Sequence, residues 1–271
     1  MALEVYDGHE ITQLGLLRLH HRADLDPQVL LKAIQTPGDL LKRSSKTETR
    51  RVGEWLVKRS LPERGLGPVK RTLARNRYRR AWRAANWLRA HGVHVPEPLA
   101  YGEWTAFGAV FGNVMVTEFL DGFENVELYA ARLAKEAQEL PFIPNWPPHH
   151  DYWPPPPAPP LDSFFHRLAE AINGLEEAGA YHADLSGKNI FTKDGQEFYF
   201  IDLDGVVLGI DHRDKHRLKN HVQLYDSFCD FCDTRALLWF HAHVQRTHVP
   251  LESWMQAVVE GQAARRRRHQ E

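Results

Sequence analysis

Residues 181–205 constrain the fold of this 271-residue chain more than any other segment. They open with Tyr-His-Ala-Asp-Leu-Ser-Gly-Lys-Asn, in which Asp184 stands two residues after His182 and five residues before Asn189. Two apolar runs on either side of an Asp-Gly turn follow, which is the pattern of a β-hairpin, and Asp202 comes directly after the second run. Because the two ends of a hairpin lie close together, the pattern predicts that Asn189 and Asp202 reach one site.

Hydrophobic periodicity predicts a β-rich first half and a largely helical second half. The first 35 residues have the pattern of a polar extension with one short helix near residues 27–34. The strands expected next are residues 39–43, 48–52 and 54–59, followed by a hairpin of residues 100–107 and 113–119. The expected helices are residues 70–90, a segment capped by Asp162 or Ser163 that ends near Gly179, and most of residues 216–264.

This order of elements predicts an α+β fold with two lobes and a cleft between them. Residues 1–35 would form an N-terminal extension, residues 36–120 a small β-rich lobe, and residues 121–271 a larger, mainly helical lobe. Ten of the 17 prolines fall in residues 141–160, which we expect to be an insertion that forms a polyproline-like surface loop.

The net charge of −1 hides an asymmetry along the chain. Residues 41–83 contain 15 lysines and arginines against three acidic residues. A segment of that sign favours an anionic partner, such as phosphate groups, nucleic acid or an anionic membrane, although a solvated helix face is the alternative. A second basic run, residues 265–268, lies near the polar end of the chain, where we expect a disordered tail that adds attraction to anionic lipid.

The composition indicates a globular protein in a reducing compartment. Hydrophobic residues make up 43% and charged residues 25% of the chain, and two cysteines cannot form a disulfide scaffold. No run of about 18 apolar residues is present to span a membrane, and the polar first residues do not resemble a secretory signal. We therefore expect a cytoplasmic protein.

The residue types in and around residues 181–205 suit phosphoryl transfer, in which an acceptor hydroxyl must be oriented and relieved of its proton. Asp184 can perform both tasks, and Asn189 and Asp202 offer the oxygen ligands that Mg²⁺ prefers. Lys58 ends an apolar strand and can hold the phosphates that are not transferred. His182 would anchor the loop through its ring nitrogens.

Several segments in the same order resemble the protein-kinase-like superfamily, and within it the lipopolysaccharide core sugar kinases, which phosphorylate Kdo or heptose. The resemblance rests on Arg-Val-Gly-Glu-Trp-Leu-Val-Lys ending at Lys58, on Trp-Arg-Ala-Ala from Trp82, on Gly-Val-His-Val-Pro-Glu-Pro from Gly92, on residues 181–189, and on Phe-Ile-Asp-Leu-Asp from Phe200. It extends over about residues 36–245.

The resemblance implies a bilobal kinase-like fold, with ATP and Mg²⁺ as cofactors and transfer of the γ-phosphate to a hydroxyl of a core sugar. It makes Asp184 the catalytic base, Asn189 and Asp202 the metal ligands, and Lys58 the lysine at the ATP phosphates.

The resemblance also implies a hinge at residues 117–120, where backbone groups of Glu118 and Leu120 would bind the edge of the adenine. The acceptor would be lipopolysaccharide core or another anionic glycoconjugate. The basic segments would then suit a peripheral enzyme at the cytoplasmic face of the inner membrane.

The chain departs from the family pattern at three places. Residues 43–46 (Arg-Ser-Ser-Lys) stand where a glycine-rich loop would cover the phosphates, and Asp204 replaces the glycine of the Asp-Phe-Gly motif. Ala81 replaces the glutamate that would pair with Lys58, and the whole predicted helix 70–90 contains no acidic residue. The change at Asp204 points away from a protein substrate, whereas the change at Ala81 leaves open how Lys58 is held.

Other functions stay open at this point. The acceptor could be another small molecule or a protein Ser/Thr, and the departures also fit a nucleotide-binding pseudokinase with a regulatory role. The arginine-rich helix could bind nucleic acid, although a glycolipid partner fits the motifs better. Cys229 and Cys232 with His241 and His243 could hold zinc, but their place in a helical, aromatic segment favours buried thiols.

Overall fold

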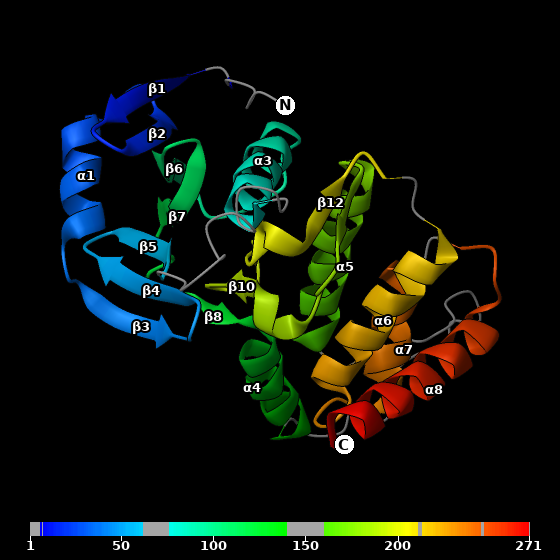
Figure 1. Ribbon diagram of the computed structural model, residues 1–271. Helices are drawn as coiled ribbons and strands as arrows, with labels where there is room; N and C mark the ends of the chain where they lie inside the picture. The colour runs from blue at the N-terminus through cyan, green and yellow to red at the C-terminus, as the bar shows by residue number, and fades with distance from the viewer. Residues whose placement is uncertain are drawn as a thin grey trace. The chain divides into compact units, whose positions relative to one another are not determined.

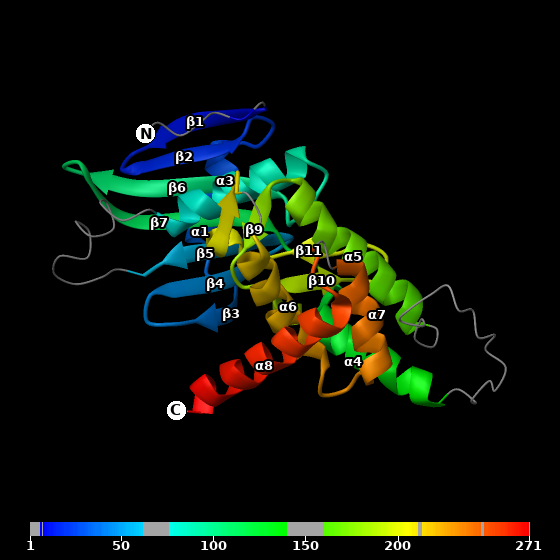
Figure 2. The ribbon, with the colours of Figure 1, turned by 90° about the vertical axis from the view of Figure 1, so that its right-hand side faces the viewer.

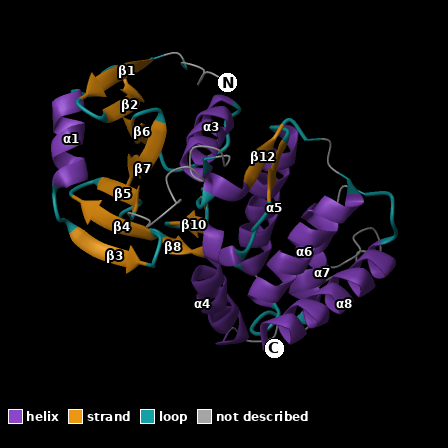
Figure 3. Cartoon of the chain, viewed as in Figure 1, coloured by secondary structure: helices purple, strands orange, loops and turns teal. Residues whose placement is uncertain are grey.

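The computed structural model describes residue 6 and residues 8–61, 76–139, 160–210, 213–244 and 247–270. The chain forms two compact units (Figure 1). The first comprises Met1–Ala90, Val95–Asp121 and Asp202–Gly205, and the second comprises His91–His94, Gly122–Ile201 and Val206–Glu271. The structure is therefore mixed α/β, with a β-rich N-terminal part and a helical C-terminal part (Figure 3), whereas the lobe boundaries expected from the sequence stay predictions.

An antiparallel seven-stranded sheet with the order β1-β2-β6-β7-β5-β4-β3 forms the centre of the first unit. Its strands are β1 (His9–Leu14), β2 (Leu17–Arg22), β3 (Asp39–Arg43), β4 (Thr47–Val52), β5 (Trp55–Ser60), β6 (Pro98–Ala106) and β7 (Ala109–Glu118). The strands predicted between residues 39 and 59 and the hairpin predicted between residues 100 and 119 are thereby confirmed. Gly53 has a φ of 62° in the β4–β5 turn, which explains a glycine at that position.

The strands β1 and β2 go beyond the expectation from the sequence, which has only one helix in this region. Leu17 and Leu19 are buried and alternate with the exposed Arg18, so β2 presents one apolar face to the core. β2 pairs with β6, which places residues 9–22 inside the sheet. The predicted short helix is also confirmed, as α1 (Pro27–Gln35), and the Asp26 side chain caps its first turn.

The helices α1 and α3 (Arg77–Ala90) cover opposite faces of this sheet (Figure 1). Leu30 and Ile34 of α1 pack in a core cluster with buried residues of β2, β5, β6 and β7. On the other face, the ring of Trp82 lies 6.4 Å from that of Tyr101, centroid to centroid. Neighbouring residues of a strand point to opposite faces, so the sheet can bury side chains against both helices.

Helices dominate the second unit and enclose an aromatic core. They are α4 (Val126–Glu139), α5 (Leu161–Glu177), α6 (Asp214–Phe228), α7 (Thr234–Val244) and α8 (Leu251–Gln270). The ring of Phe165 in α5 lies 5.5 Å from that of Phe228 in α6 and 5.0 Å from that of Phe240 in α7. These contacts join α5 to two helices that lie much later in the sequence.

The second unit also contains two small sheets, and the predicted Asp-Gly hairpin is part of one of them. Strands β10 (Ile190–Thr192), β11 (Tyr199–Phe200) and β8 (Glu124–Asn125) form the order β11-β10-β8, and Gly195 has a φ of 74° in the hairpin turn. Strand β9 (Ala180–His182) pairs with β12 (Val206–Leu208). Residues 183–189 therefore run between two strands, through the 3-10 turn η1 (Gly187–Asn189).

Two predictions about helix ends are wrong. Pro160, rather than Asp162 or Ser163, is the N-cap residue of α5, and no side chain caps this end. Residues 265–268 belong to α8 instead of a disordered tail. The reason is ionic, because Arg266 Nε lies 2.6 Å from Asp226 Oδ1 of α6 and Arg265 also pairs with Asp226, which ties the basic turn of α8 to its neighbour.

Two further expectations concern the proline-rich insertion and the membrane. Residues 141–159 of the insertion lie outside the described residues, so its predicted loop form stays a prediction. Among the helices of the described ranges, none has the length and apolar character needed to cross a lipid bilayer.

Candidate active site

Lys58 lies in the middle of the sheet of the first unit, and it pairs with Asp202. Its strand β5 runs between β4 and β7, where Thr49 and Met115 are its register partners. The side chain reaches Asp202 at 2.8 Å from Nζ to Oδ1, with 33% of the lysine and 46% of the aspartate side chain exposed. The structure thus brings together two of the predicted site residues and supplies a carboxylate for Lys58 in the absence of a glutamate at Ala81.

Asp202 adopts a backbone conformation that few side chains tolerate. Its φ is 56°, in the left-handed region, which aspartate enters more readily than most residues other than glycine. The 3-10 turn η2 (Leu203–Gly205) follows at once and packs against α3. Arg77 at the start of α3 lies 3.8 Å from Asp204, Nε to Oδ2, so α3 meets this acidic segment with a cation.

A buried polar network fixes the start of α3 on the sheet. Asn76 accepts a hydrogen bond from the Tyr78 amide at 3.0 Å and donates from Nδ2 to Tyr101 and Glu103 at 2.8 and 3.0 Å. Arg79 donates to both carboxylate oxygens of Glu103, at 2.9 and 3.0 Å. Asn76 caps the helix, so α3 begins at Arg77. The helix start predicted near residue 70 lies outside the described residues.

The tyrosine of this network stays protonated. Burial, together with the nearby charge of Glu103 and the hydrogen bond to it, raises the pKa of Tyr101. Its hydroxyl therefore donates to the Glu103 carboxylate, as the structure has it. Side chains of β6 thus hold the start of α3. The sequence analysis missed this network, because no single one of its polar residues forms a recognisable motif.

The second unit holds Asp184 and Asn189 in contact with each other. Asn189 donates from Nδ2 to the Asp184 carbonyl oxygen at 2.8 Å and to its Oδ2 at 3.0 Å. Asp184 itself is exposed. The loop spacing predicted from the sequence thus places the carboxylate of the candidate base at the surface, oriented by the amide five residues further on.

His182 anchors this loop through both ring nitrogens, as predicted. Its Nδ1 accepts from the Asp184 amide at 3.2 Å, which assigns the ring proton to Nε2. Nε2 lies 2.9 Å from the carbonyl oxygen of Ile201, to which it donates. The amide of Ile201 in turn donates to the Asn189 carbonyl at 2.9 Å, so the loop and the residue before Asp202 are connected.

Two buried side chains of α6 hold the same loop and were missed from the sequence. Gln223 accepts at Oε1 from the Leu185 amide at 3.0 Å and donates from Nε2 to Ala183 O and Asp184 Oδ1, both at 3.2 Å. Ser227 accepts from the Gly187 amide at 2.8 Å. The sequence does contain a hint of this role. Gln223 and Ser227 are four residues apart, so in a helix they lie on the same face, together with the apolar residues.

For the phosphoryl transfer predicted from the sequence, replacing Gln223 by leucine is expected to lower kcat about 10²-fold with little change in the KM for ATP, since misplacement of a reacting group by about 1 Å has effects of that size. The change removes all three hydrogen bonds to residues 183–185 at nearly constant side-chain volume. Steady-state kinetics of the purified variant give the measurement. A matched control is Gln256→Leu on the exposed face of α8, and equal kcat values for both variants would contradict the positioning role.

Ser44 organises the turn of residues 43–46, where the resemblance led us to look for a glycine-rich loop. Its hydroxyl oxygen accepts from the amides of Lys46 and Thr47 at 3.2 and 3.1 Å, so two backbone donors of this turn are already used. Arg43 and Lys46 are exposed. This turn could therefore bind phosphate through its cationic side chains.

The predicted hinge follows the buried end of β7. The Glu118 amide donates to the Glu97 carbonyl oxygen at 2.9 Å, and the Phe119 amide donates to Glu54 O at 2.8 Å. These bonds tie the segment to neighbouring strands. The Glu118 carbonyl oxygen also accepts from the Thr117 hydroxyl at 3.2 Å, so a further partner would have to use the second lone pair of this oxygen.

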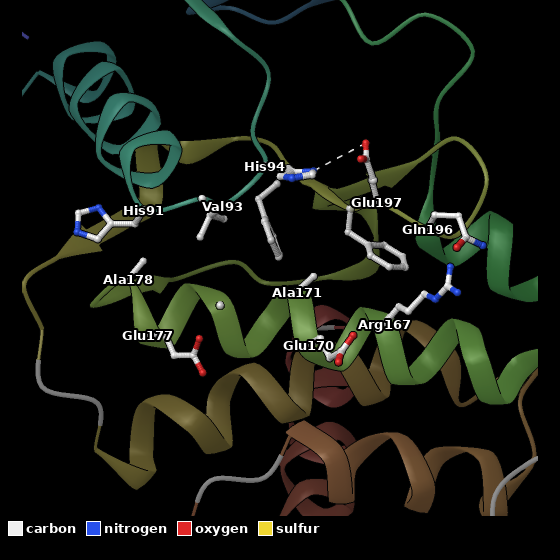
Figure 4. Close-up of a pocket in the computed structure, with 14 residues that line it drawn as sticks. His91, Val93, His94, Arg167, Glu170, Ala171, Glu177, Ala178, Gln196 and Glu197 are labelled. Atoms are coloured by element: carbon white, nitrogen blue, oxygen red, sulfur yellow. Dashed lines mark ion pairs between the residues drawn. The ribbon is translucent and has the colours of Figure 1, made fainter. Parts of the chain in front are cut away.

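A cavity of about 640 Å³ opens elsewhere in the second unit (Figure 4). It lies between α5, the segment His91–His94 and the residues around β11, and His94 Nδ1 lies 3.9 Å from Glu197 Oε2 at its rim. None of the predicted site residues lines it. This cavity is therefore separate from the residues with the chemistry of phosphoryl transfer.

The cysteine and histidine residues considered for zinc have other partners. Burial raises the pKa of Cys232 to about 12, which disfavours the thiolate that zinc requires. His241 Nδ1 lies 2.8 Å from His221 Nδ1, and His243 Nδ1 lies 2.8 Å from the Trp239 carbonyl oxygen. The preference for buried thiols is confirmed for Cys232, while Cys229 is half-buried beside Arg266.

Comparisons with known proteins agree with the resemblance noted from the sequence. A model of the lipopolysaccharide kinase (Kdo/WaaP) family matches residues 157–248, which include Asp184, Asn189, Asp202 and Gln223. A solved structure of WaaP in complex with acyl carrier protein is 22% identical, has a TM-score of 0.57, and is matched over 90% of this chain and 91% of that chain. The present chain therefore shares the fold of WaaP.

Two other comparisons add little. A structure of WbdD is 16% identical with a TM-score of 0.49, over 81% of this chain and 44% of that chain. No curated protein sequence matches the chain.

Proposed function

We propose, from the match of residues 157–248 to the lipopolysaccharide kinase (Kdo/WaaP) family, that this protein is an ATP-dependent kinase with a bilobal kinase-like fold. It transfers the γ-phosphate of ATP to a hydroxyl of a lipopolysaccharide core sugar, Kdo or heptose. The observation that carries the proposal is the exposed Asp184 carboxylate, held by Asn189 and Gln223 within the matched segment. An exposed, doubly oriented carboxylate suits a base that must meet an acceptor hydroxyl from solution.

Asp184 accepts or orients the proton of the acceptor hydroxyl. Its two carboxylate oxygens receive hydrogen bonds from different amides, Oδ1 from Gln223 and Oδ2 from Asn189. These donors restrict rotation of the carboxylate. A fixed orientation serves a group that must position the acceptor hydroxyl, as phosphoryl transfer requires.

Each of the two predicted metal ligands offers an oxygen atom of the kind that suits a magnesium ion. Asn189 uses its amide nitrogen in both bonds to Asp184, which leaves its amide oxygen as a ligand, and Asp202 has a half-exposed carboxylate. Oxygen atoms of this kind are the ligands that Mg²⁺ takes together with substrate phosphates. When bound, the ion would neutralise charge on the transferred phosphoryl group.

Lys58 and the hinge would bind the nucleotide. Lys58 would exchange part of its ion pair with Asp202 for contact with the phosphates, and Arg43 and Lys46 would add cations above them. The carbonyl of Glu118 and the backbone of Leu120 would meet the adenine edge. The β-rich lobe of residues 36–120 would thus serve the nucleotide, and the lobe of residues 121–271 the chemistry.

The decisive experiment incubates the purified protein with labelled ATP, Mg²⁺ and a panel of core glycolipids, free sugars, aminoglycosides and proteins. The solved WaaP structure contains acyl carrier protein, so each reaction is run with and without that protein. We expect label in Kdo- or heptose-containing glycolipid. Label in another acceptor alone would refute the proposed core-sugar substrate. If no acceptor supports Mg²⁺-dependent ATP turnover, the result would favour the pseudokinase alternative.

Replacing Lys58 by methionine is expected to raise the KM for ATP about 10- to 100-fold, since a charge-assisted hydrogen bond contributes about 1.5–3 kcal/mol. Initial rates over a range of ATP concentrations give the measurement. Lys32→Met, at an exposed lysine of α1, is the matched control. An unchanged KM in the Lys58 variant would rule out its role at the phosphates.

A further inference from the structure

The tip of the β6–β7 hairpin exposes a phenylalanine in an unfavourable backbone conformation. Phe107 is fully exposed and has a φ of 50°, and Gly108 beside it has a φ of 74°. Two successive residues at positive φ form a turn that asparagine and glycine favour at its first position, whereas a large apolar side chain is uncommon there. A residue that is unfavourable both for its exposure and for its backbone calls for a functional explanation.

A second exposed apolar side chain lies at the same end of the sheet. Leu16, in the β1–β2 turn, is 62% exposed. The Thr105 amide donates to the Leu16 carbonyl at 2.9 Å, and Leu17 pairs with Trp104, so this turn lies beside the end of β6. Figure 2 shows the β6–β7 hairpin projecting from this end of the sheet.

The exposed charges at this end are cationic. Arg18 is exposed next to the Leu16 turn, and the β3–β4 turn with Lys46 lies at the same end because Thr47 pairs with Ser60 at the end of β5. The acidic residues nearby, Glu48 and Glu103, are buried in ion pairs with arginines. In the described part of the sheet, this end therefore combines apolar tips with positive charge.

We infer that this end of the sheet docks on a lipid bilayer with anionic headgroups. Phe107 and Leu16 enter the boundary between headgroups and acyl chains, and Arg18 contacts the lipid phosphates. The biological purpose of such docking, access to a glycolipid acceptor, rests on the proposed function. The β3–β4 turn that would meet the ATP phosphates lies at the docked end, near the surface that holds a glycolipid acceptor.

A bilayer fits these residues better than a protein partner does. Specific protein interfaces bury roughly 1,200–2,000 Å² and are packed continuously. Here the apolar side chains stand on separate turns, and Arg18 is exposed beside one of them. A fluid lipid bilayer can accept such protruding side chains anywhere on its surface. A protein partner would need a cavity that matches each of them.

The test measures sedimentation of the full-length protein with vesicles of phosphatidylethanolamine and phosphatidylglycerol, and with vesicles of phosphatidylcholine alone. The variant is Phe107→Asn, because asparagine tolerates positive φ and leaves the hairpin at least as stable. Arg18→Gln tests the charge. Leu128→Asn on α4 is the matched control, since Leu128 is 60% exposed and lies in the second unit.

We expect the wild-type protein to bind the anionic vesicles only, and Phe107→Asn to weaken its partition about tenfold, from the apolar area of one phenylalanine. Arg18→Gln should weaken it several-fold, and Leu128→Asn should leave it unchanged. Thermal unfolding should show no loss of stability in Phe107→Asn. Failure of the wild-type protein to bind, which would point to a protein partner, or equal binding by Phe107→Asn, would overturn the inference.

Vesicle binding requires neither ATP nor an acceptor, so it is independent of the proposed reaction. Binding without kinase activity would refute the proposed function and leave the docking surface standing. Kinase activity on a dissolved acceptor without vesicle binding would do the reverse.

Discussion

Replacing Asp184 by alanine is expected to lower turnover about 10³-fold, since a positioned general base contributes about 10²- to 10⁴-fold. Nucleotide binding should stay largely intact, because Lys58 and the hinge residues are unchanged. The measurement combines steady-state rates on the identified acceptor with calorimetric titration of the variant by a non-hydrolysable ATP analogue.

Two controls make this result specific. Glu252→Ala removes an exposed carboxylate from the first turn of α8 and should keep full activity. Circular dichroism should show that the Asp184 variant is folded, because the exposed carboxylate contributes little to the core. Undiminished turnover in Asp184→Ala would rule out the proposed base.

Lowering the pH from 7 to 5 is expected to reduce the free energy of unfolding by several kcal/mol. Burial, followed by the charge of Arg18, lowers the pKa of His20 to about 4. Burial lowers the pKa of His221 to about 3 and that of His241 in the same direction. His221 Nδ1 lies 2.8 Å from His241 Nδ1, and Trp254 Nε1 donates to His221 Nδ1 at 3.1 Å. A proton added to His221 Nδ1 would disrupt both contacts.

The sign follows from proton binding. Folding depresses these pKa values, so the unfolded chain binds more protons below its ordinary histidine pKa of about 6.5. The stabilisation is fully present above that pH and is lost as the pH falls towards 4 and then 3. At pH 5 each such histidine accounts for about 2 kcal/mol.

Urea unfolding followed by tryptophan fluorescence at pH 7, 6 and 5 measures this loss. Replacing His20 by phenylalanine keeps an aromatic ring beside Tyr101 and removes one titrating group from the first unit. The variant should lose less stability between pH 7 and pH 5 than the wild-type protein. A pH dependence identical in the two proteins would contradict the role of His20.

Short-range features were predictable from the sequence because their geometry depends on neighbouring residues. The hairpin around Gly195 and the strands β3, β4 and β5 follow from alternation and turn residues, and one of the two bonds of the His182 ring is to an amide only two residues away. The spacing of Asp184 and Asn189 likewise places them in contact. The family resemblance drew on the same local patterns, and a family model confirms it over residues 157–248.

Partners distant in the sequence were decided by the tertiary structure. Lys58 lacks a glutamate on α3 and pairs with Asp202, 144 residues away, while the helix presents Arg77 to Asp204. Residues 265–268 form a helical turn because Asp226 of α6 lies beside them, which no property of the basic run itself predicts.

The sequence by itself thus determined the loop that carries Asp184, its hairpin and its likeness to a kinase family. Only the tertiary structure decided what holds that loop and Lys58 in place. Gln223 and Ser227 of α6 hold the loop, and Asp202, itself at positive φ, holds Lys58. The physical reason is that leaving a buried polar atom without a partner costs free energy, and the packing of helices that are distant in the sequence decides which partner is within reach.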